Sequence, residues 1–147
     1  EKILTQDIVY VGGGNTKSML AVWRDWNLDL ILQKAYKNGI VMSGVSAGAI
    51  CWFEKGITDS YAKGLEILNC LGFIKGIACP HFDEEREREP YVNELIKREL
   101  ISSCICIEGY SALHVNKNGF KTINFGDNKQ CFNLYKENNK ILKKYFS

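Results

Sequence analysis

Two short apolar runs that each lead into a glycine-rich turn constrain the fold of this chain more than any other feature. Residues 7–11 are β-branched or aromatic in the main, and they stop at Gly-Gly-Gly-Asn-Thr, residues 12–16. Residues 40–43 lead in the same way into residues 44–48. Apolar residues at helical spacing follow the first turn, and small or apolar residues follow the second. Consecutive strand–turn–helix patterns of this kind predict an α/β fold with a parallel sheet.

The rest of the chain predicts the elements that complete such a domain. Residues 40–43 are nearly all apolar, which is typical of a strand buried on both faces of a parallel sheet. Residues 57–72 are polar and punctuated by glycine, so they predict an ordered loop with a short helix. A strand is expected at 74–79 and a helix at 90–100. The last part predicts largely antiparallel strands at 104–107, 112–115, 121–125 and 131–135, with a hairpin signal at Asn118-Gly119.

Composition and charge are those of an ordinary folded domain, and they argue against nucleic acid and membranes as partners. Hydrophobic residues make up 46% and charged residues 24%, which excludes a disordered chain. The 19 Lys and Arg residues against 17 Asp and Glu give a net charge of +2, without the basic stripe that binds nucleic acid or anionic membranes. No apolar stretch reaches the roughly 18 residues that span a bilayer, and no secretory signal is recognised. No linker or repeat divides the chain, so residues 1–147 are assigned to a single domain.

The cysteines predict buried free thiols in a reducing compartment, and hence a cytoplasmic location. They show no Cys-x-x-Cys spacing, and a chain of this length can form a core without disulfides. Neither of the two histidines belongs to a Cys/His ligand cluster, so no metal ion is expected. The six cysteines are Cys51, Cys70, Cys79, Cys104, Cys106 and Cys131.

The strongest signal for chemistry is Gly44-Val45-Ser46-Ala47-Gly48, between a predicted strand and a predicted helix. A nucleophile on so tight a turn needs small neighbours, and the turn exposes the Ser46 hydroxyl at the carboxyl end of the sheet. The N–H of Ala47 can then face a developing oxyanion, with Gly13 or Gly14 as the second donor. Two alternatives are a glycine-rich turn without function and a nucleotide phosphate loop, although the Gly-x-x-x-x-Gly-Lys pattern of such loops is absent.

A serine nucleophile needs a base, and the chain has two histidines. His81 follows an apolar strand at the Pro80 corner, where a loop can turn over the sheet edge, whereas His114 lies in mid-strand, a position that is more often structural. We therefore predict His81 as the base. Among the carboxylates that could orient it, Glu108 has the best context, because it ends the strand at 104–107. Periodicity alone leaves the choice open among Asp59, Asp83, Glu84 and Glu108.

Residues 83–89 form a strongly charged segment just before a predicted helix. Such a segment is usually a solvated helix start, and that is its simplest interpretation. Arg88, however, lies seven residues after His81, close enough to face the same cleft and bind a substrate carboxylate through two hydrogen bonds.

Taken together, the motifs resemble those of peptidase E, the family of aspartyl dipeptidases in the serine peptidase group that includes cyanophycinase. The resemblance runs from about residue 8 to residue 115. It implies a flavodoxin-like α/β fold related to class I glutamine amidotransferases, and a catalytic triad of Ser46, His81 and Glu108. The motifs that carry it are, in order, residues 12–16, residues 44–48, Pro80-His81-Phe82 and Glu108-Gly109.

The resemblance also implies a reaction and a set of substrate contacts. The reaction is hydrolysis of peptides with an N-terminal aspartyl residue (Asp-X) through an acyl-enzyme, without a cofactor. Asn15 is expected among the substrate-binding residues, and Asp59 is expected to support the site or contact the substrate amine. The arginine that binds the aspartate side chain is Arg88 or Arg86, since the loop after His81 is shorter than in the best-known members.

The chain departs from the family pattern at its start. The family places two further strand–helix units before the glycine-loop strand, whereas this chain begins only seven residues before Ile8. Without those units the strand at Ile8 would have an open, apolar edge. We therefore expect a longer precursor, a second chain that supplies the missing strands, or a homo-oligomer. Two alternatives to the Asp-X dipeptidase are a cyanophycinase-like β-aspartyl peptidase and a catalytically silent interaction module.

Overall fold

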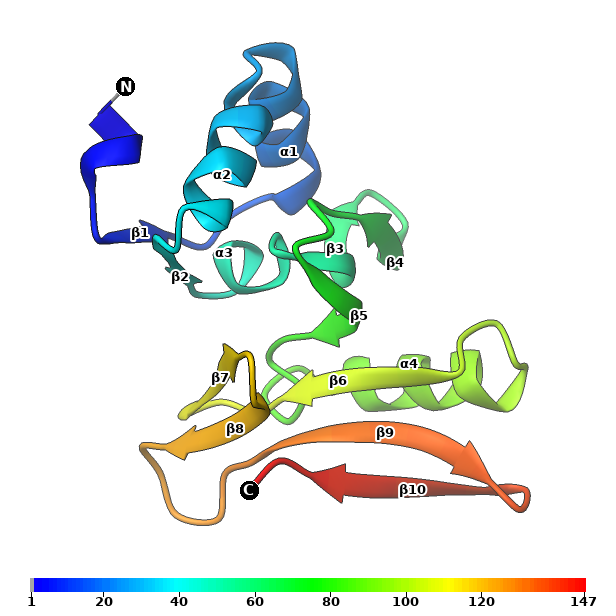
Figure 1. Cartoon of the computed structure of the whole chain (residues 1–147). Helices are drawn as coiled ribbons and strands as arrows, with labels where there is room; N and C mark the ends of the chain where they lie inside the picture. Colours follow the sequence, from blue (N-terminus) through cyan, green and yellow to red (C-terminus); the bar gives the residue numbers. More distant parts are fainter. Residues whose placement is uncertain (1) are drawn as a thin grey trace. The chain divides into compact units, whose positions relative to one another are not determined.

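The structure is a computed structural model that describes residues 2–147 (Figure 1). The chain divides into two compact units, of which the first ends at Lys75 and the second runs from Gly76 to Ser147. Both units contain a parallel strand pair together with helices, so the predicted α/β class is confirmed. The flavodoxin-like arrangement, the two missing strand–helix units and the single domain remain predictions.

The first unit opens with the two strand–turn–helix patterns that the sequence predicts. β1 and β2 pair in parallel, with Val11 opposite Gly44. α1 begins after Asn15, because the side-chain Oδ1 of Asn15 accepts the N–H of Ser18 at 2.9 Å. The elements of this unit are a 3-10 helix (Lys2–Thr5), β1 (Ile8–Val11), α1 (Thr16–Asp25), α2 (Leu28–Lys37), β2 (Val41–Gly44), α3 (Ala47–Ile50), β3 (Phe53–Tyr61) and β4 (Gly64–Asn69).

The core of the first unit is a cluster of apolar side chains from α1, α2 and the segment after α3. The two helices lie side by side in Figure 1. Leu20 of α1 and Leu32 of α2 are fully buried and cluster with Cys51 and Trp52. The ring of Trp52 stacks on that of Phe73, with 5.8 Å between ring centroids. The apolar stripe of each helix thus packs into the hydrophobic core of this unit.

One face of the β1–β2 pair is exposed. Ile8 is 60%, Tyr10 67% and Val41 55% exposed, while Val9 packs against the core on the other face. The prediction that the second strand is buried on both faces is therefore wrong. Within residues 2–147 β1 and β2 form a sheet of two strands, and alternate side chains of such a sheet point away from the core.

Residues 57–72 form most of a hairpin, so the predicted loop with a short helix is wrong. β3 and β4 pair antiparallel, with Ile57 opposite Ile67. Gly64, at the turn, has φ +104°, which favours glycine. Apolar and polar residues alternate along β4, from Leu65 through Glu66 to Ile67, which is the pattern of a half-buried strand.

The second unit contains the sheet β5–β6–β9–β10 and a separate hairpin, β7–β8 (Figure 1, green to red). β5 and β6 are parallel, whereas the β6–β9, β9–β10 and β7–β8 pairs are antiparallel, as predicted for the end of the chain. No helix within residues 2–147 is long and apolar enough to cross a membrane. The elements are β5 (Ile74–Cys79), which leads into the unit, α4 (Arg88–Lys97), β6 (Ser103–Ile107), β7 (Ser111–Asn116), β8 (Gly119–Asn124), β9 (Cys131–Glu137) and β10 (Lys140–Tyr145).

The last strand, β10, has no counterpart among the elements predicted from the sequence. It follows a two-residue turn in which Asn138 has φ +47° and Asn139 has φ +63°. Asparagine tolerates this left-handed conformation better than most residues, and paired left-handed residues are typical of hairpin turns. The sequence therefore contains the signal for this turn. The strand after it is rich in lysine and shows only weak alternation of apolar and polar residues, so its own pattern does not predict a strand.

Candidate active site

Ser46 lies on the sharp turn that joins β2 to α3, where the sequence places it. Its backbone has φ +55° and ψ −117°. The turn is closed by the N–H of Gly48, which donates to the carbonyl of Val45 at 2.9 Å, and by the N–H of Ile50, which donates to the carbonyl of Ser46 at 3.1 Å. The side chain of Ser46 is partly exposed. This turn presents a hydroxyl group at the carboxyl end of a parallel strand.

Close packing against β1 explains why glycine flanks the turn on both sides. A Cβ atom at Gly44 would lie 2.5 Å from the carbonyl oxygen of Val11, and one at Gly48 would lie 2.6 Å from the carbonyl carbon of the same residue. The N–H of Val45 donates to that Val11 oxygen at 3.1 Å, which fixes the distance between the two strand ends. Any larger residue at position 44 or 48 would push the turn away from β1.

The glycine loop after β1 lies next to Ser46. A Cβ atom at Gly13 would be 3.4 Å from Cβ and 3.9 Å from Oγ of Ser46, so the bare backbone of Gly13 borders the hydroxyl group. Gly14 has φ +146°, and Gly12, Gly13 and Gly14 are all exposed. The structure thus brings Ser46, Ala47 and the predicted donors of the glycine loop together in the first unit.

The two predicted substrate contacts of the first unit lie at the edge of this loop. Asn15 caps α1 and also donates from Nδ2 to the carbonyl of Ser60 at 3.2 Å. Asp59 is exposed on β3, beside Ser60, whose hydroxyl accepts the N–H of Thr16 at 2.9 Å. These hydrogen bonds join the start of α1 to the last part of β3. Asn15 and Asp59 therefore both lie close to this junction.

His81 lies in the second unit, in the turn that follows β5. Its φ is +51°, and its Nδ1 is 2.7 Å from Oε2 of Glu84. Glu84 is one of the four carboxylates that the sequence leaves open as partners of this histidine. Its position three residues after His81 is the signal that could have favoured it. His114, the other histidine, lies exposed in β7.

Glu108 lies directly after β6, where the strand pattern places it. Its Oε2 accepts the N–H of Gln130 at 2.9 Å, and its own N–H donates to the carbonyl of Gln130 at 3.2 Å. The carboxylate thus joins the end of β6 to the start of β9. Its place in a triad stays a prediction.

The two candidate arginines differ sharply in exposure. Arg88 is only 2% exposed, and its Nε and Nη2 atoms both lie 2.6 Å from Oε2 of Glu85. Arg86 is exposed to a greater degree. Sequence reasoning missed Glu85 as a partner of Arg88, although the spacing of three residues is common for ion pairs on a helical turn.

The family model described as peptidase family S51 matches residues 1–123. This chain belongs to peptidase family S51. It is also 47% identical over 122 residues to a protein of Bacillus subtilis (strain 168) named as the uncharacterized peptidase YgaJ. The match covers 82% of this chain and 53% of the relative, so the chain spans about half the length of that protein.

Membership of family S51 confirms the resemblance to peptidase E that the motifs indicate. The family match includes Ser46, His81, Glu108 and both arginines, and it ends before β9. The strands β9 and β10 therefore lie beyond the part of the chain that the family model describes.

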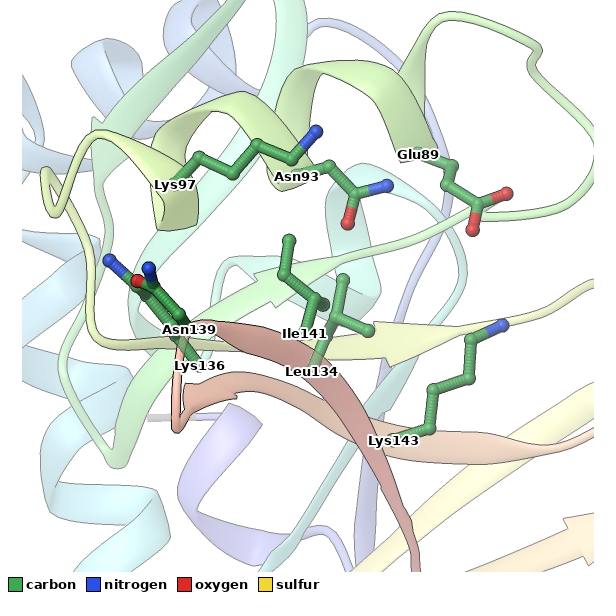
Figure 2. A pocket seen from close by; sticks show the side chains of 8 residues that line it. All are labelled: Glu89, Asn93, Lys97, Leu134, Lys136, Asn139, Ile141 and Lys143. Carbon is green, nitrogen blue, oxygen red and sulfur yellow. The ribbon is translucent and has the colours of Figure 1, made fainter.

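A hollow in the second unit is lined by none of the predicted site residues (Figure 2). It opens between α4 and the β9–β10 strands and has a volume of about 570 Å³. No serine or histidine lines it. Among residues 2–147, no group of three or more His, Cys, Asp or Glu side chains is placed to hold a metal ion. The hollow is lined by Glu89, Asn93, Lys97, Leu134, Lys136, Asn139, Ile141 and Lys143.

All six cysteines of this S51 chain are free, and five of them are buried, as predicted. Burial raises the pKa of the thiols of Cys51, Cys79, Cys104, Cys106 and Cys131. It also raises the pKa of Cys70, which is partly exposed, to about 11. Because the thiolate is the nucleophilic form, the raised pKa lowers the reactivity of each of these thiols near neutral pH.

We expect a thiol reagent at pH 8 to modify every cysteine of the folded protein at least about 10-fold more slowly than those of the urea-unfolded chain. For Cys70, a pKa of about 11 against an ordinary 9.0 lowers the thiolate fraction by about 100-fold, of which the greater nucleophilicity of the thiolate restores about 10-fold. The other thiols are also shielded from the reagent. Absorbance at the reagent's leaving-group band measures the rates, and a cysteine that reacts at the unfolded rate would contradict the burial described above.

Proposed function

We propose that this protein is a serine-type dipeptidase that hydrolyses Asp-X peptides through an acyl-enzyme. The observation that carries the proposal is Ser46 on its tight turn, with the backbone of Gly13 beside the hydroxyl group. Membership of a peptidase family supports the reaction class. The free, buried cysteines agree with a reducing compartment, and we propose the cytoplasm.

In the proposed reaction, Oγ of Ser46 attacks the α-carbonyl carbon of the N-terminal aspartyl residue, which is the carbonyl of the scissile peptide bond. His81 takes the hydroxyl proton and later gives it to the departing amine, so that the peptide C–N bond breaks as the acyl-enzyme forms. The N–H groups of Ala47 and of Gly13 or Gly14 stabilise the oxyanion. A water molecule then attacks the ester, with His81 again as base, and releases aspartate.

The proposal assigns substrate recognition to residues around these groups. Asp59, an exposed carboxylate on β3, is a candidate for the substrate amine, and Asn15 for a further polar contact. Since Glu85 holds the buried Arg88, the more exposed Arg86 is the better candidate for the aspartate carboxylate. Glu108 is the sequence-based candidate for the acid that orients His81.

A screen of dipeptides with purified protein tests this function. Asp-X substrates should be hydrolysed with a kcat/KM about 10- to 100-fold above that of Asn-X, because Asn-X lacks a charged hydrogen-bond acceptor. Glu-X peptides test the length of the pocket. Preference for isoaspartyl or aspartyl-arginine substrates would favour the cyanophycinase-like alternative. Absence of hydrolysis for every peptide would contradict the proposal.

The exposed apolar face of the β1–β2 pair favours a second candidate, an interaction module without activity. Ile8, Tyr10 and Val41 are available on this face for a partner strand, a second copy or a second chain. A fluorophosphonate probe separates the two candidates. Stoichiometric labelling of Ser46 would favour the peptidase, whereas a stable complex without labelling would favour the interaction module.

A further inference from the structure

We propose that the hollow between α4 and the β9–β10 strands binds a short peptide whose first residue is acidic. Its volume of about 570 Å³ falls within the range of sites that hold small ligands. The hollow lies wholly within the second unit, shares no residue with the proposed catalytic site, and is formed in part by strands beyond the family match. Peptide binding there can therefore be tested whether or not the protein hydrolyses peptides.

The floor of the hollow is aliphatic. Leu134 on β9 is 2% exposed, and Ile141 on β10 is half-buried. Leu134 pairs with Lys143 and Ile141 pairs with Lys136, so all four side chains project from the same face of the sheet. The hollow thus has an apolar base, and each of its two strands adds one lysine at the side.

α4 supplies a polar stripe above this floor (Figure 2). Glu89, Asn93 and Lys97 recur every four residues, so they share one face of the helix. The helix rises by about 12 Å between Glu89 and Lys97. An extended peptide advances by about 3.3–3.6 Å per residue, so about three or four residues would span this distance.

Opposite charges lie together at one end of the hollow. Figure 2 shows Glu89 and Lys143 at this end, and Lys97 and Lys136 at the other. The buried thiol of Cys106 supports the first pairing. Burial is the main reason that the pKa of this thiol is raised, and Lys143 lowers this pKa whereas Glu89 raises it. Both charges therefore act on the same part of the sheet.

Three of the charged groups around the hollow have no partner of opposite charge. Within residues 2–147, Glu89, Lys97 and Lys143 form no ion pair, whereas Nζ of Lys136 is 2.8 Å from Oε1 of Glu99. A simple anion at Lys143 would be repelled by Glu89. The arrangement instead favours a ligand with a positive and a negative group at one end and a second negative group at the other.

A short peptide with an acidic first residue carries its charges in this order. Glu89 can accept hydrogen bonds from the N-terminal ammonium group, and Lys143 can donate to the carboxylate of the first side chain. Nζ of Lys143 lies 4.5 Å from the centre of the Phe132 ring, a cation–π contact that holds it beside the floor. Lys97 then meets the C-terminal carboxylate of a peptide of about three or four residues.

Titration with the peptide Asp-Leu-Ala tests the proposal. The Ser46→Ala protein is used so that the peptide stays intact. The methyl signals of Ile141 in NMR report binding in the hollow, and they should shift to saturation with a Kd of about 1 mM or lower. Removal of one charge from the peptide should raise the Kd about 5-fold, as expected for a partly exposed ion pair. The peptides N-acetyl-Asp-Leu-Ala, Asn-Leu-Ala and Asp-Leu-Ala-amide each lack one charge.

Substitutions in the hollow should give the matching losses. Lys143→Met should raise the Kd of Asp-Leu-Ala about 5-fold and leave that of Asn-Leu-Ala unchanged, because the second peptide lacks the carboxylate that Lys143 binds. Glu89→Gln should behave in the same way towards Asp-Leu-Ala and its N-acetyl form. Lys144→Met is the matched control, since Lys144 lies next to Lys143 on β10 but on the opposite face, and the Kd should stay at the parent value.

Three outcomes would overturn the proposal. They are unshifted methyl signals of Ile141, an equal Kd for all four peptides, and displacement of Asp-Leu-Ala by inorganic phosphate at equal concentration, which would indicate a general anion surface. Hydrolysis plays no part in these measurements. The expected binding, together with a parent protein that cleaves no dipeptide, would support the peptide site in the hollow and contradict the proposed peptidase function.

Discussion

Replacement of Ser46 by alanine should lower kcat for an Asp-X dipeptide by about 10⁶-fold, the loss typical when a serine peptidase loses its nucleophile. The substitution removes the atom that is proposed to form the acyl-enzyme, while Gly13 and Ala47 keep their N–H groups. Because substrate contacts remain, the KM of any residual activity should change little. Release of the free amine, followed over days at high protein concentration, measures so slow a rate.

Ser43→Ala is the matched control for this variant. Ser43 lies on β2, three residues before Ser46, and its hydroxyl donates to the carbonyl of Val9 at 3.1 Å. Its loss removes one hydrogen bond between β1 and β2 and no group that we place in the reaction. Its kcat should remain close to that of the parent protein. Hydrolysis by Ser46→Ala at the rate of the control would exclude Ser46 as the nucleophile.

Gly48→Ala should lower the free energy of unfolding by at least about 3 kcal/mol, at the upper end of the cost of overpacking. The added methyl group would overlap the backbone carbonyl of Val11 and lie 2.8 Å from the carbonyl oxygen of Gly12. Both contacts are with backbone atoms, which cannot rotate away as a side chain can. Urea denaturation followed by tryptophan fluorescence measures the loss, since Trp52 lies in the core of this unit.

Gly12→Ala offers the control for backbone entropy. Like Gly48→Ala, this substitution adds one methyl group to a glycine, here in the loop after β1. The methyl group at position 12 would meet no atom within 4 Å. The free energy of unfolding should change by no more than about 0.5 kcal/mol. An equal loss in both variants would show that glycine is needed at position 48 for a reason other than its contact with β1.

The parts of the site that could be predicted from sequence are those encoded by neighbouring residues. The turn at residues 44–48 needs small residues because β1 passes against it, and the glycines indicate that need. The pair Asn15-Thr16 before the apolar helix pattern indicates a cap for α1, and the structure shows that Asn15 is the capping residue. In both cases a short run of neighbouring residues carries the signal, even though the strand that contacts the turn is distant in the sequence.

The parts that could not be predicted depend on backbone conformation or on distant segments. The partner of His81 follows from the left-handed backbone of that residue, and its spacing from Glu84 fits many other turns. Burial of Arg88 depends on the packing of α4, whereas the charge of residues 83–89 indicates a solvated segment. The exposure of Val41 depends on how many strands belong to its sheet. The apolar residues next to it in the sequence do not indicate that number.

The backbone of Ser46 carries a consequence for how this chain balances stability against activity. A residue other than glycine in a sparsely populated region of positive φ costs about 1–3 kcal/mol, and φ +55° with ψ −117° lies in such a region. Selection for stability alone would favour glycine at this position, since glycine adopts such angles freely. The proposed role of the hydroxyl group would account for a serine at this cost in stability, and stabilising substitutions chosen from backbone angles alone would include the proposed nucleophile among their targets.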